Sequence, residues 1–171
     1  MSGFQKVVPV VLLLLPTASV SAQLLPVETP APAFTTRTMA GQPLSLQGLR
    51  GKVVLLDYWA TWCSTCHQTT PILESLHNRF GKQGLAVVGM SADDRHSIAA
   101  VKPFVKQFGM TYTITIDPAE NGRAQYAYHV DTLPAQYLID KRGIIRWSHT
   151  GYSSTEKQQL APLIKRLLAE R

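Results

Sequence analysis

The 171-residue chain has little cysteine, few charges and no apolar run long enough to cross a membrane. It contains only two cysteines, and charged residues make up 16% of it, which is low for a globular protein. Lys and Arg outnumber Asp and Glu by 17 to 11, but they are scattered and form no basic cluster. A nucleic-acid-binding surface is therefore not expected. No internal repeat is present, and the length suits one domain with extensions.

The N-terminal residues have the pattern of a secretory signal. A single lysine precedes the apolar stretch 7–15, and Val20-Ser21-Ala22 suits signal-peptidase cleavage. The apolar stretch is shorter than the roughly 20 residues of a membrane-spanning helix, so an uncleaved anchor is the weaker alternative. We predict a signal peptide over residues 1–22 and an exported protein, in a periplasm or elsewhere outside the cytoplasm. Residues 23–33 are rich in proline and are predicted to be an extended linker.

Residues 34–171 alternate strand and helix patterns. Strands are expected at 34–38, 43–46, 53–59, 85–90, 112–117, 135–140 and 144–148. Helices are expected at 63–80, 97–108 and 121–128, and a last helix is expected after a capping box formed by Ser153 and Glu156. This order predicts one α/β or α+β domain, with a mixed central sheet and helices on both of its faces.

The two cysteines form the sequence Cys63-Ser64-Thr65-Cys66, directly after the apolar strand 53–59. A disulfide across two intervening residues closes a very small loop and stabilises a fold little, so the pair is better suited to thiol–disulfide exchange. At a helix start, unpaired amides and the helix dipole favour the thiolate of Cys63. We expect Cys63 to exchange with a substrate sulfur and Cys66, about one turn further, to resolve the mixed disulfide.

The stretch from Gly51 to Cys66, with Pro71 five residues later and Leu133-Pro134 before a late strand, resembles the thioredoxin superfamily, and more closely its exported TlpA/ResA-like branch. The resemblance extends over most of residues 34–170. It implies a thioredoxin fold with an N-terminal β-hairpin and a central helix–strand insertion at about 97–117. It also implies thiol–disulfide oxidoreductase activity carried by the redox-active disulfide alone, without a bound cofactor or metal.

The resemblance assigns roles to four further residues. It implies a cis peptide bond at Pro134, which faces the redox pair, and a backbone at Leu133 that receives a substrate strand. Asp57 is implied to be buried behind the pair, where it can relay a proton to the resolving thiol. Trp62 is expected beside the site, in contact with substrate. The chain departs from its branch at three positions. Many members have a non-acidic residue at the position of Asp57, and some reductive members have an acidic residue at the position of Thr69. The position of Leu133 is commonly Thr, Val or Ile.

The resemblance also implies partners. It favours a monomeric reductant of protein disulfides that receives electrons from a membrane thiol donor, with apocytochrome c or the cysteines of metal sites as clients. Cytochrome c biogenesis is the process implied. The direction of electron flow depends on the reduction potential, which no residue of the sequence determines. A disulfide-forming oxidase is therefore the alternative to the reductant that the resemblance favours.

The sequence Cys-x-x-Cys-His is compatible with two further functions. It also marks covalent attachment of a c-type haem, with His67 as an iron ligand and Met90 or Met110 opposite. The preceding buried strand and the surrounding α/β pattern argue against this interpretation. The two thiolates could instead bind Cu(I) or Zn(II), with help from His67 or a methionine. In a redox protein, His67 could add positive charge near the cysteines, but we expect it to be an exposed helix residue without a catalytic role.

Overall fold

The computed structural model describes residues 23–116 and 123–170. The predicted signal peptide, residues 1–22, lies outside the described residues, as does the start of the helix predicted at 121–128.

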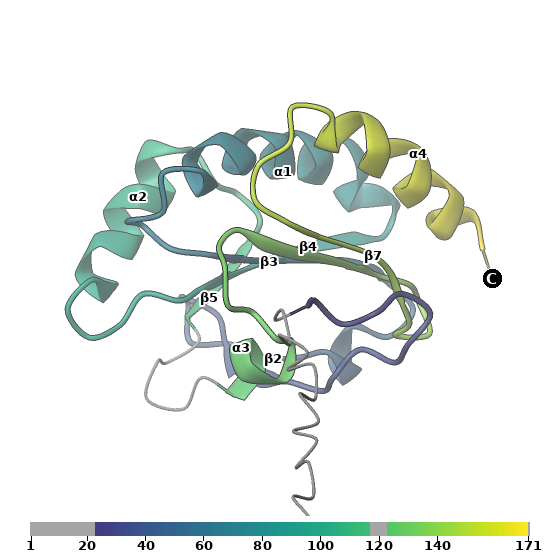
Figure 1. The fold of residues 1–171 in the computed structure, drawn as a ribbon, viewed down its shortest axis with the longest axis horizontal. Helices are drawn as coiled ribbons and strands as arrows, with labels where there is room; N and C mark the ends of the chain where they lie inside the picture. Colours follow the sequence, from purple (N-terminus) through teal and green to yellow (C-terminus); the bar gives the residue numbers. More distant parts are fainter. Residues whose placement is uncertain (1–22, 117–122, 171) are drawn as a thin grey trace, which may run out of the picture.

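A five-stranded mixed sheet forms the centre of the domain (Figure 1). Its three central strands are almost entirely buried and largely apolar, which is the pattern of a sheet covered on both faces. The strand order is β5-β4-β3-β6-β7; β3, β4 and β5 are parallel, whereas β6 and β7 run antiparallel to their neighbours. The strands are β3 (Val53–Trp59), β4 (Leu85–Ser91), β5 (Thr113–Ile116), β6 (Ala135–Ile139) and β7 (Ile145–Thr150).

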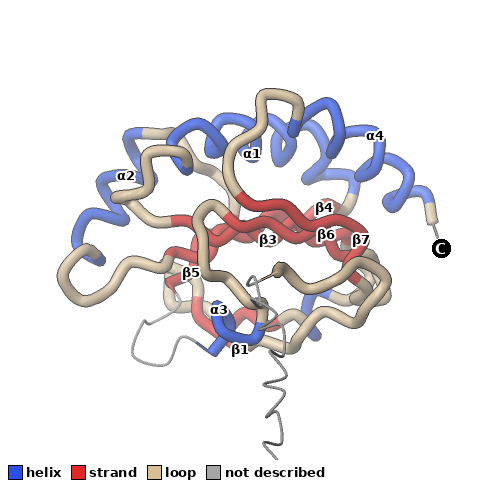
Figure 2. The backbone as a smooth tube through the Cα atoms, viewed as in Figure 1, coloured by secondary structure: helices blue, strands red, loops and turns tan. Residues whose placement is uncertain are grey.

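Helices cover both faces of the sheet, as the sequence predicted (Figure 2). The helices α1 (Cys66–Phe80), α2 (Val101–Gln107) and α4 (Glu156–Ala169) lie on one face. The short helix α3 (Arg123–Ala127) lies on the other, with the hairpin of β1 (Thr35–Arg37) and β2 (Pro43–Ser45). Single 3-10 turns occur at Gln47–Leu49, Gly81–Gln83 and Ile98–Ala100.

Alternation along β3 divides its side chains between two apolar cores. Val53, Leu55 and Trp59 belong to the core under α1, α2 and α4, whereas Leu56 and Tyr58 belong to the core on the opposite face. Successive residues of a strand point to opposite faces, so Asp57 faces α1 and α4 with Leu55 and Trp59. The core that α1 and α4 cover is therefore the one that holds the polar group predicted to act in catalysis.

Helix boundaries differ from the sequence prediction at two places. The helix predicted from Cys63 begins at Cys66, because residues 61–65 form turns before the first helical residue. The helix predicted over 97–108 is a 3-10 turn followed by α2, and Pro103 lies in the first turn of α2. Proline is tolerated there because the amide it removes would have no partner within the helix.

N-terminal segments cover both edges of the sheet. At the β5 edge, the Met39 amide donates to the Ile114 carbonyl at 2.9 Å. At the β7 edge, the Glu28 amide donates to the Ile145 carbonyl at 2.7 Å and the Ala31 amide to the Gly143 carbonyl at 2.9 Å. Residues 23–33, predicted to be an extended linker, thus lie along β7 and occupy edge groups that could otherwise pair with another chain.

We expect Gly89→Ala to destabilise the domain by about 1–3 kcal/mol, because the added methyl group overpacks the core. A Cβ at Gly89 would lie 2.9 Å from Ile114 Cδ1 and 3.0 Å from both Trp59 Nε1 and Tyr112 Cε2. Urea denaturation of the variant measures the loss. Ala86→Ser, at a half-buried position of the same strand, is the control, and an equal loss in both variants would contradict the steric explanation.

Candidate active site

The two cysteines lie in the turn between β3 and α1 and form a disulfide bond. Cys63 retains 6% exposure, whereas Cys66, the first residue of α1, has none. The Cys66 amide donates to Cys63 Sγ at 3.2 Å, and the Thr65 hydroxyl lies 3.4 Å from the same sulfur. Cys63 therefore precedes the helix instead of opening it, but its sulfur still faces an amide of the first helical turn. In the reduced protein, these groups favour negative charge on Cys63.

A hollow of about 430 Å³ opens beside Cys63. Its wall consists of Trp62, Cys63, Ser64, Thr65, Ala92, Gln125, Asp131 and Leu133. Trp62 is 65% exposed, which is unusual for so large an apolar side chain. Cys63 belongs to the wall and Cys66 does not, so a molecule in the hollow meets Cys63 first.

The Leu133–Pro134 peptide bond is cis, as the resemblance implied. Leu133 is half-buried and forms part of the hollow, whereas Pro134 is buried and leads directly into β6. The Pro134 carbonyl accepts a hydrogen bond from the Gly151 amide at 2.9 Å. That bond joins the loop before β6 to the end of β7, which holds Leu133 at the hollow.

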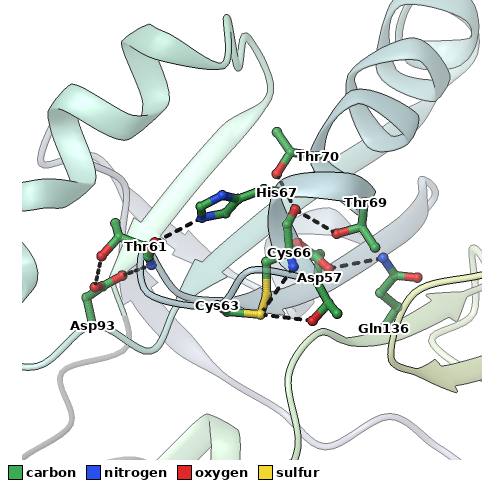
Figure 3. The surroundings of a disulfide bond; sticks show 10 residues. Asp57, Thr61, Cys63, Cys66, His67, Thr69, Thr70, Asp93 and Gln136 are labelled. Carbon is green, nitrogen blue, oxygen red and sulfur yellow. Dashed lines mark hydrogen bonds between the residues drawn. A yellow bond between two sulfur atoms is a disulfide. The ribbon is translucent and has the colours of Figure 1, made fainter.

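Asp57 lies behind the redox pair, with only 1% of its surface exposed (Figure 3). Its cross-strand neighbour on β6 is Gln136, whose Nε2 donates to Asp57 Oδ1 at 3.2 Å. Burial raises the pKa of Asp57 to about 7, because a buried carboxylate loses its hydration. The Gln136 hydrogen bond lowers this pKa and the nearby Glu156 carboxylate raises it. A carboxyl group with a pKa near neutrality can both accept and release a proton in neutral solution.

Glu156 does not act in the predicted capping box. Ser153 Oγ accepts a hydrogen bond from the Thr155 amide at 3.3 Å, and α4 begins at Glu156 with Thr155 as its N-cap. The Glu156 side chain is fully buried, and neither of its carboxylate oxygens has a hydrogen-bond partner among the described residues. Burial raises the pKa of Glu156 to about 7, because a buried carboxylate loses its hydration.

A second buried carboxylate anchors the turn before the cysteines. Asp93, 1% exposed, accepts hydrogen bonds from the Thr61 amide at 3.0 Å and the Thr61 hydroxyl at 2.6 Å (Figure 3). It also accepts a hydrogen bond from the Ser91 hydroxyl at 2.7 Å. These bonds tie the turn at Thr61 to the end of β4. Ser91, the last residue of β4, and Asp93 are both buried and serve this attachment.

His67 is not the exposed residue that we expected. Its Nε2 lies 3.0 Å from the Thr61 carbonyl, and its ring packs against Phe104 and Phe108 at centroid distances of 5.0 and 5.2 Å. The nitrogen that would have to bind iron in a c-type cytochrome faces a backbone carbonyl instead. His67 therefore joins α1 to the turn at Thr61 and to α2.

Comparison with known proteins identifies the family. The model of the AhpC/TSA family matches residues 27–148. The chain belongs to this family. It is 31% identical to thiol-disulfide oxidoreductase ResA of Bacillus anthracis over 137 residues, which span 80% of the chain and 76% of the relative. It is 36% identical to the thioredoxin-like protein YneN of Bacillus subtilis over 129 residues, 75% of the chain and 73% of the relative.

The solved structures to which the chain is similar also belong to thiol:disulfide interchange proteins. A candidate thiol:disulfide interchange protein DsbE from Chlorobium tepidum superimposes with a TM-score of 0.77 at 28% identity, over 85% of this chain and 99% of that one. A second thiol:disulfide interchange protein from Chlorobium tepidum gives 0.70 at 27% identity, over 83% and 97%. The chain is thus a thioredoxin-fold, ResA/DsbE-type thiol-disulfide oxidoreductase with its Cys-x-x-Cys pair at Cys63 and Cys66. Within the described residues, none of the helices combines the length and apolarity required to cross a bilayer.

In this AhpC/TSA-family oxidoreductase, the residues singled out from the sequence lie together around the disulfide. Trp62 and Leu133 share the hollow with Cys63, and Asp57 lies on the inner side of the pair. Thr69, at a position that is acidic in some relatives, donates its hydroxyl to the Cys66 carbonyl at 3.0 Å and offers no acid there. Across the described parts of the chain, no group of three or more His, Cys, Asp or Glu side chains is placed to hold a metal ion.

Sequence reasoning did not single out two groups of buried or half-buried polar residues near the disulfide. The first is the pair Gln136, which is hydrogen-bonded to Asp57, and Glu156, whose charge acts on Asp57. The second is the anchor formed by Asp93 and His67 at the turn. The resemblance pointed to Asp57, which interrupts an apolar strand, and Gln136 interrupts β6 in the same way. That signal could have identified Gln136, whereas no local pattern distinguishes Glu156 from an ordinary capping residue.

Proposed function

We propose that the protein is an exported reductant of protein disulfides, in which Cys63 attacks and Cys66 resolves. The observation that carries these roles is the difference in access. Cys63 forms part of the open hollow, whereas Cys66 is fully buried at the first turn of α1. The attacking sulfur must reach a substrate disulfide in line, but the resolving sulfur needs only to reach Cys63.

The exchange proceeds in two balanced steps. The Cys63 thiolate attacks one sulfur of a substrate disulfide, which forms a Cys63–substrate disulfide and releases the other substrate sulfur as a thiolate. Cys66 then loses its proton and attacks Cys63 Sγ, which forms the Cys63–Cys66 disulfide and releases the second substrate thiolate. Two electrons pass from the protein dithiol to the substrate, and no cofactor besides the disulfide itself takes part.

Asp57 is the proposed base for the second step. It lies among the side chains around the pair, on the inner face that Cys66 occupies (Figure 3). Its pKa of about 7 allows the carboxylate to accept the Cys66 proton in neutral solution and later to return it. Cys66 is buried, so a proton acceptor within the core replaces the water that an exposed thiol would use.

Trp62, Leu133 and Pro134 are the proposed substrate contacts. The exposed Trp62 ring offers an apolar surface beside Cys63, and Leu133 forms another part of the same hollow. A substrate segment in this hollow would place its cysteine at Cys63. Such a wall suits a cysteine in an extended, partly apolar peptide segment.

The proposed setting is outside the cytoplasm, with a monomeric protein that receives electrons from a membrane thiol donor. The apolar stretch 7–15 and the small residues before Gln23 support export. The likeness to ResA- and DsbE-type thiol-disulfide oxidoreductases, which are typically extracytoplasmic, supports the same setting. Apocytochrome c and the cysteines of metal sites are the proposed clients, because both require free thiols before haem or metal is attached.

The reduction potential tests the proposed direction. We expect the Cys63–Cys66 couple to equilibrate with dithiothreitol or glutathione near the potential of thioredoxin, about −270 mV. The extent of oxidation across a buffer series can be followed by thiol alkylation and mass, and a Cys66→Ala variant corrects for mixed disulfides with the buffer thiol. A value near about −120 mV would contradict the reductive role and indicate disulfide formation instead.

A further inference from the structure

A row of polar residues crosses the sheet beneath α4. Asp57 on β3 pairs with Gly89 on β4 and with Gln136 on β6, and Gln136 pairs in turn with His149 on β7. Paired residues on neighbouring strands share a face, so Asp57, Gln136 and His149 point to the same side of the sheet. The first residue of α4, Glu156, adds a second carboxyl group to this row.

The row contains more polar atoms than hydrogen bonds. Among the described residues, no partner is found for either oxygen of Glu156, for Gln136 Oε1 or for His149 Nε2, although all four atoms are buried. Glu156 and Gln136 have 0% and 1% of their surfaces exposed. Buried polar groups are normally paired, and a cluster of unpaired ones at one place marks a functional site or enclosed water.

One amide faces both acids. Gln136 Nε2 donates to Asp57 Oδ1 at 3.2 Å. The same side chain lies close enough to Glu156 to lower the pKa of its carboxyl group, without a hydrogen bond to either of its oxygens. The two carboxyl groups also act on each other, since the charge of Glu156 raises the pKa of Asp57. Two buried acids that repel each other cannot readily both be charged.

The other titratable groups around the row are few. Tyr112, in the segment before β5, faces Asp57, and burial together with the charges of Asp57 and Glu74 raises its pKa well above its ordinary value, so it stays neutral. Glu74 on α1 is directed toward Thr111, to which it is hydrogen-bonded. His149 carries the one imidazole among the described residues of the row, so its effect on the titration of Asp57 requires a variant of its own.

We propose that Asp57 and Glu156 form a two-carboxyl unit that holds one proton across Gln136, with Glu156 as the residue that positions this proton. The proposal rests on the proposed role of Asp57 as the base for Cys66. A single carboxyl group whose titration midpoint lies near pH 7 is protonated in about half of the molecules at pH 7, and these molecules have no base for Cys66. A unit that holds one proton between two carboxyl groups keeps one carboxylate available throughout the interval between its two titration steps.

Carboxyl ¹³C NMR titration of the oxidised, full-length protein from pH 4 to 9 tests the unit. In the unmodified protein, we expect the Asp57 and Glu156 resonances to titrate in two steps with shared midpoints. In Glu156→Gln, Asp57 should titrate in a single step whose midpoint lies lower by about one pH unit, a tenfold change in proton affinity. An Asp57 curve that is unchanged in Glu156→Gln would overturn the proposal.

Two control variants establish whether the effect is specific to Glu156. Glu170→Gln removes a carboxylate just beyond the far end of α4 and should leave the Asp57 titration unchanged. His149→Asn removes the imidazole of the row; if this variant abolishes the second step and Glu156→Gln does not, the proposal is wrong. Thermal denaturation at pH 5, where Glu156 is protonated, checks that Glu156→Gln folds.

Kinetics separate this proposal from the proposed function. The rate at which Cys66 resolves a mixed disulfide can be measured against pH in Asp57→Asn and Glu156→Gln. If Asp57→Asn leaves this profile unchanged, Asp57 is not the base, although the NMR titration can still show a coupled pair. If Asp57→Asn changes the profile and Glu156→Gln does not, Asp57 acts alone and the two-carboxyl unit is rejected.

Discussion

Cys63→Ser is expected to reduce disulfide exchange to the uncatalysed background, whereas Cys66→Ala should leave a protein that stops at the mixed disulfide with its substrate. The reason is that only Cys63 forms part of the hollow, while Cys66 lies fully buried behind it. Without Cys63 no sulfur reaches the substrate, and without Cys66 nothing releases it. Insulin reduction measures the first effect, and non-reducing gel electrophoresis with mass spectrometry detects the trapped complex.

Both variants should keep the fold, because a disulfide across two intervening residues restrains the unfolded chain little. Circular dichroism and the urea midpoint of the reduced proteins check this. Cys63→Ala is the matched control for trapping, since it leaves the buried cysteine in place. If Cys63→Ala traps substrate as well as Cys66→Ala does, the assignment of the two roles is wrong.

Asp57→Asn is expected to slow resolution by Cys66 at pH 7 by about 100-fold, the usual contribution of a positioned general base. Asparagine has nearly the same shape and can still accept the hydrogen bond from Gln136, so the loss isolates the proton transfer. Stopped-flow tryptophan fluorescence with a preformed mixed disulfide measures the step, and Trp59 and Trp62 provide signals next to the site. An unchanged rate at pH 7 would show that Asp57 is not the base.

The same variant should be more stable than the unmodified protein in alkaline solution. Folding raises the pKa of Asp57 from 3.8 to about 7, so between these values the native state holds a proton that the unfolded chain has released. Stability therefore falls as the pH rises through this interval, and above it the buried charge destabilises the fold by on the order of 4 kcal/mol. We expect Asp57→Asn to raise the free energy of unfolding at pH 8 by about 2–4 kcal/mol and to change it little at pH 4.

Urea denaturation at both pH values measures this difference. Asp94→Asn is the matched control, because Asp94 is exposed and the His96 amide lowers its pKa instead of raising it. That variant should not gain stability at pH 8. A gain for Asp57→Asn that is equal at pH 4 and pH 8 would show that the effect is not due to ionisation.

The sequence by itself determined the elements of the fold and the redox pair. Each of these depends on residues that are close together in the chain. The apolar runs of β3, β4 and β6 identify buried strands, and the helical spacing of apolar residues identifies α1 and α4. Asp57 lies within the apolar run of β3, all of which is buried, so its burial agrees with the local pattern as well as with the resemblance. The resemblance carried by Gly51 to Cys66 then predicted the cis bond at Pro134.

Only the tertiary structure decided what surrounds Asp57. Strand register brings Gln136 beside Asp57 although the two lie 79 positions apart in the chain, and no local pattern encodes that pairing. The docking of α4 turns Glu156 from the predicted capping position into the core, where desolvation raises its pKa to about 7. In the same way, the ends of β3 and β4 bring Asp93 to Thr61. Contacts between distant segments depend on how whole elements pack, and for that reason the sequence identified the cysteines but not all of the carboxyl groups that lie around them.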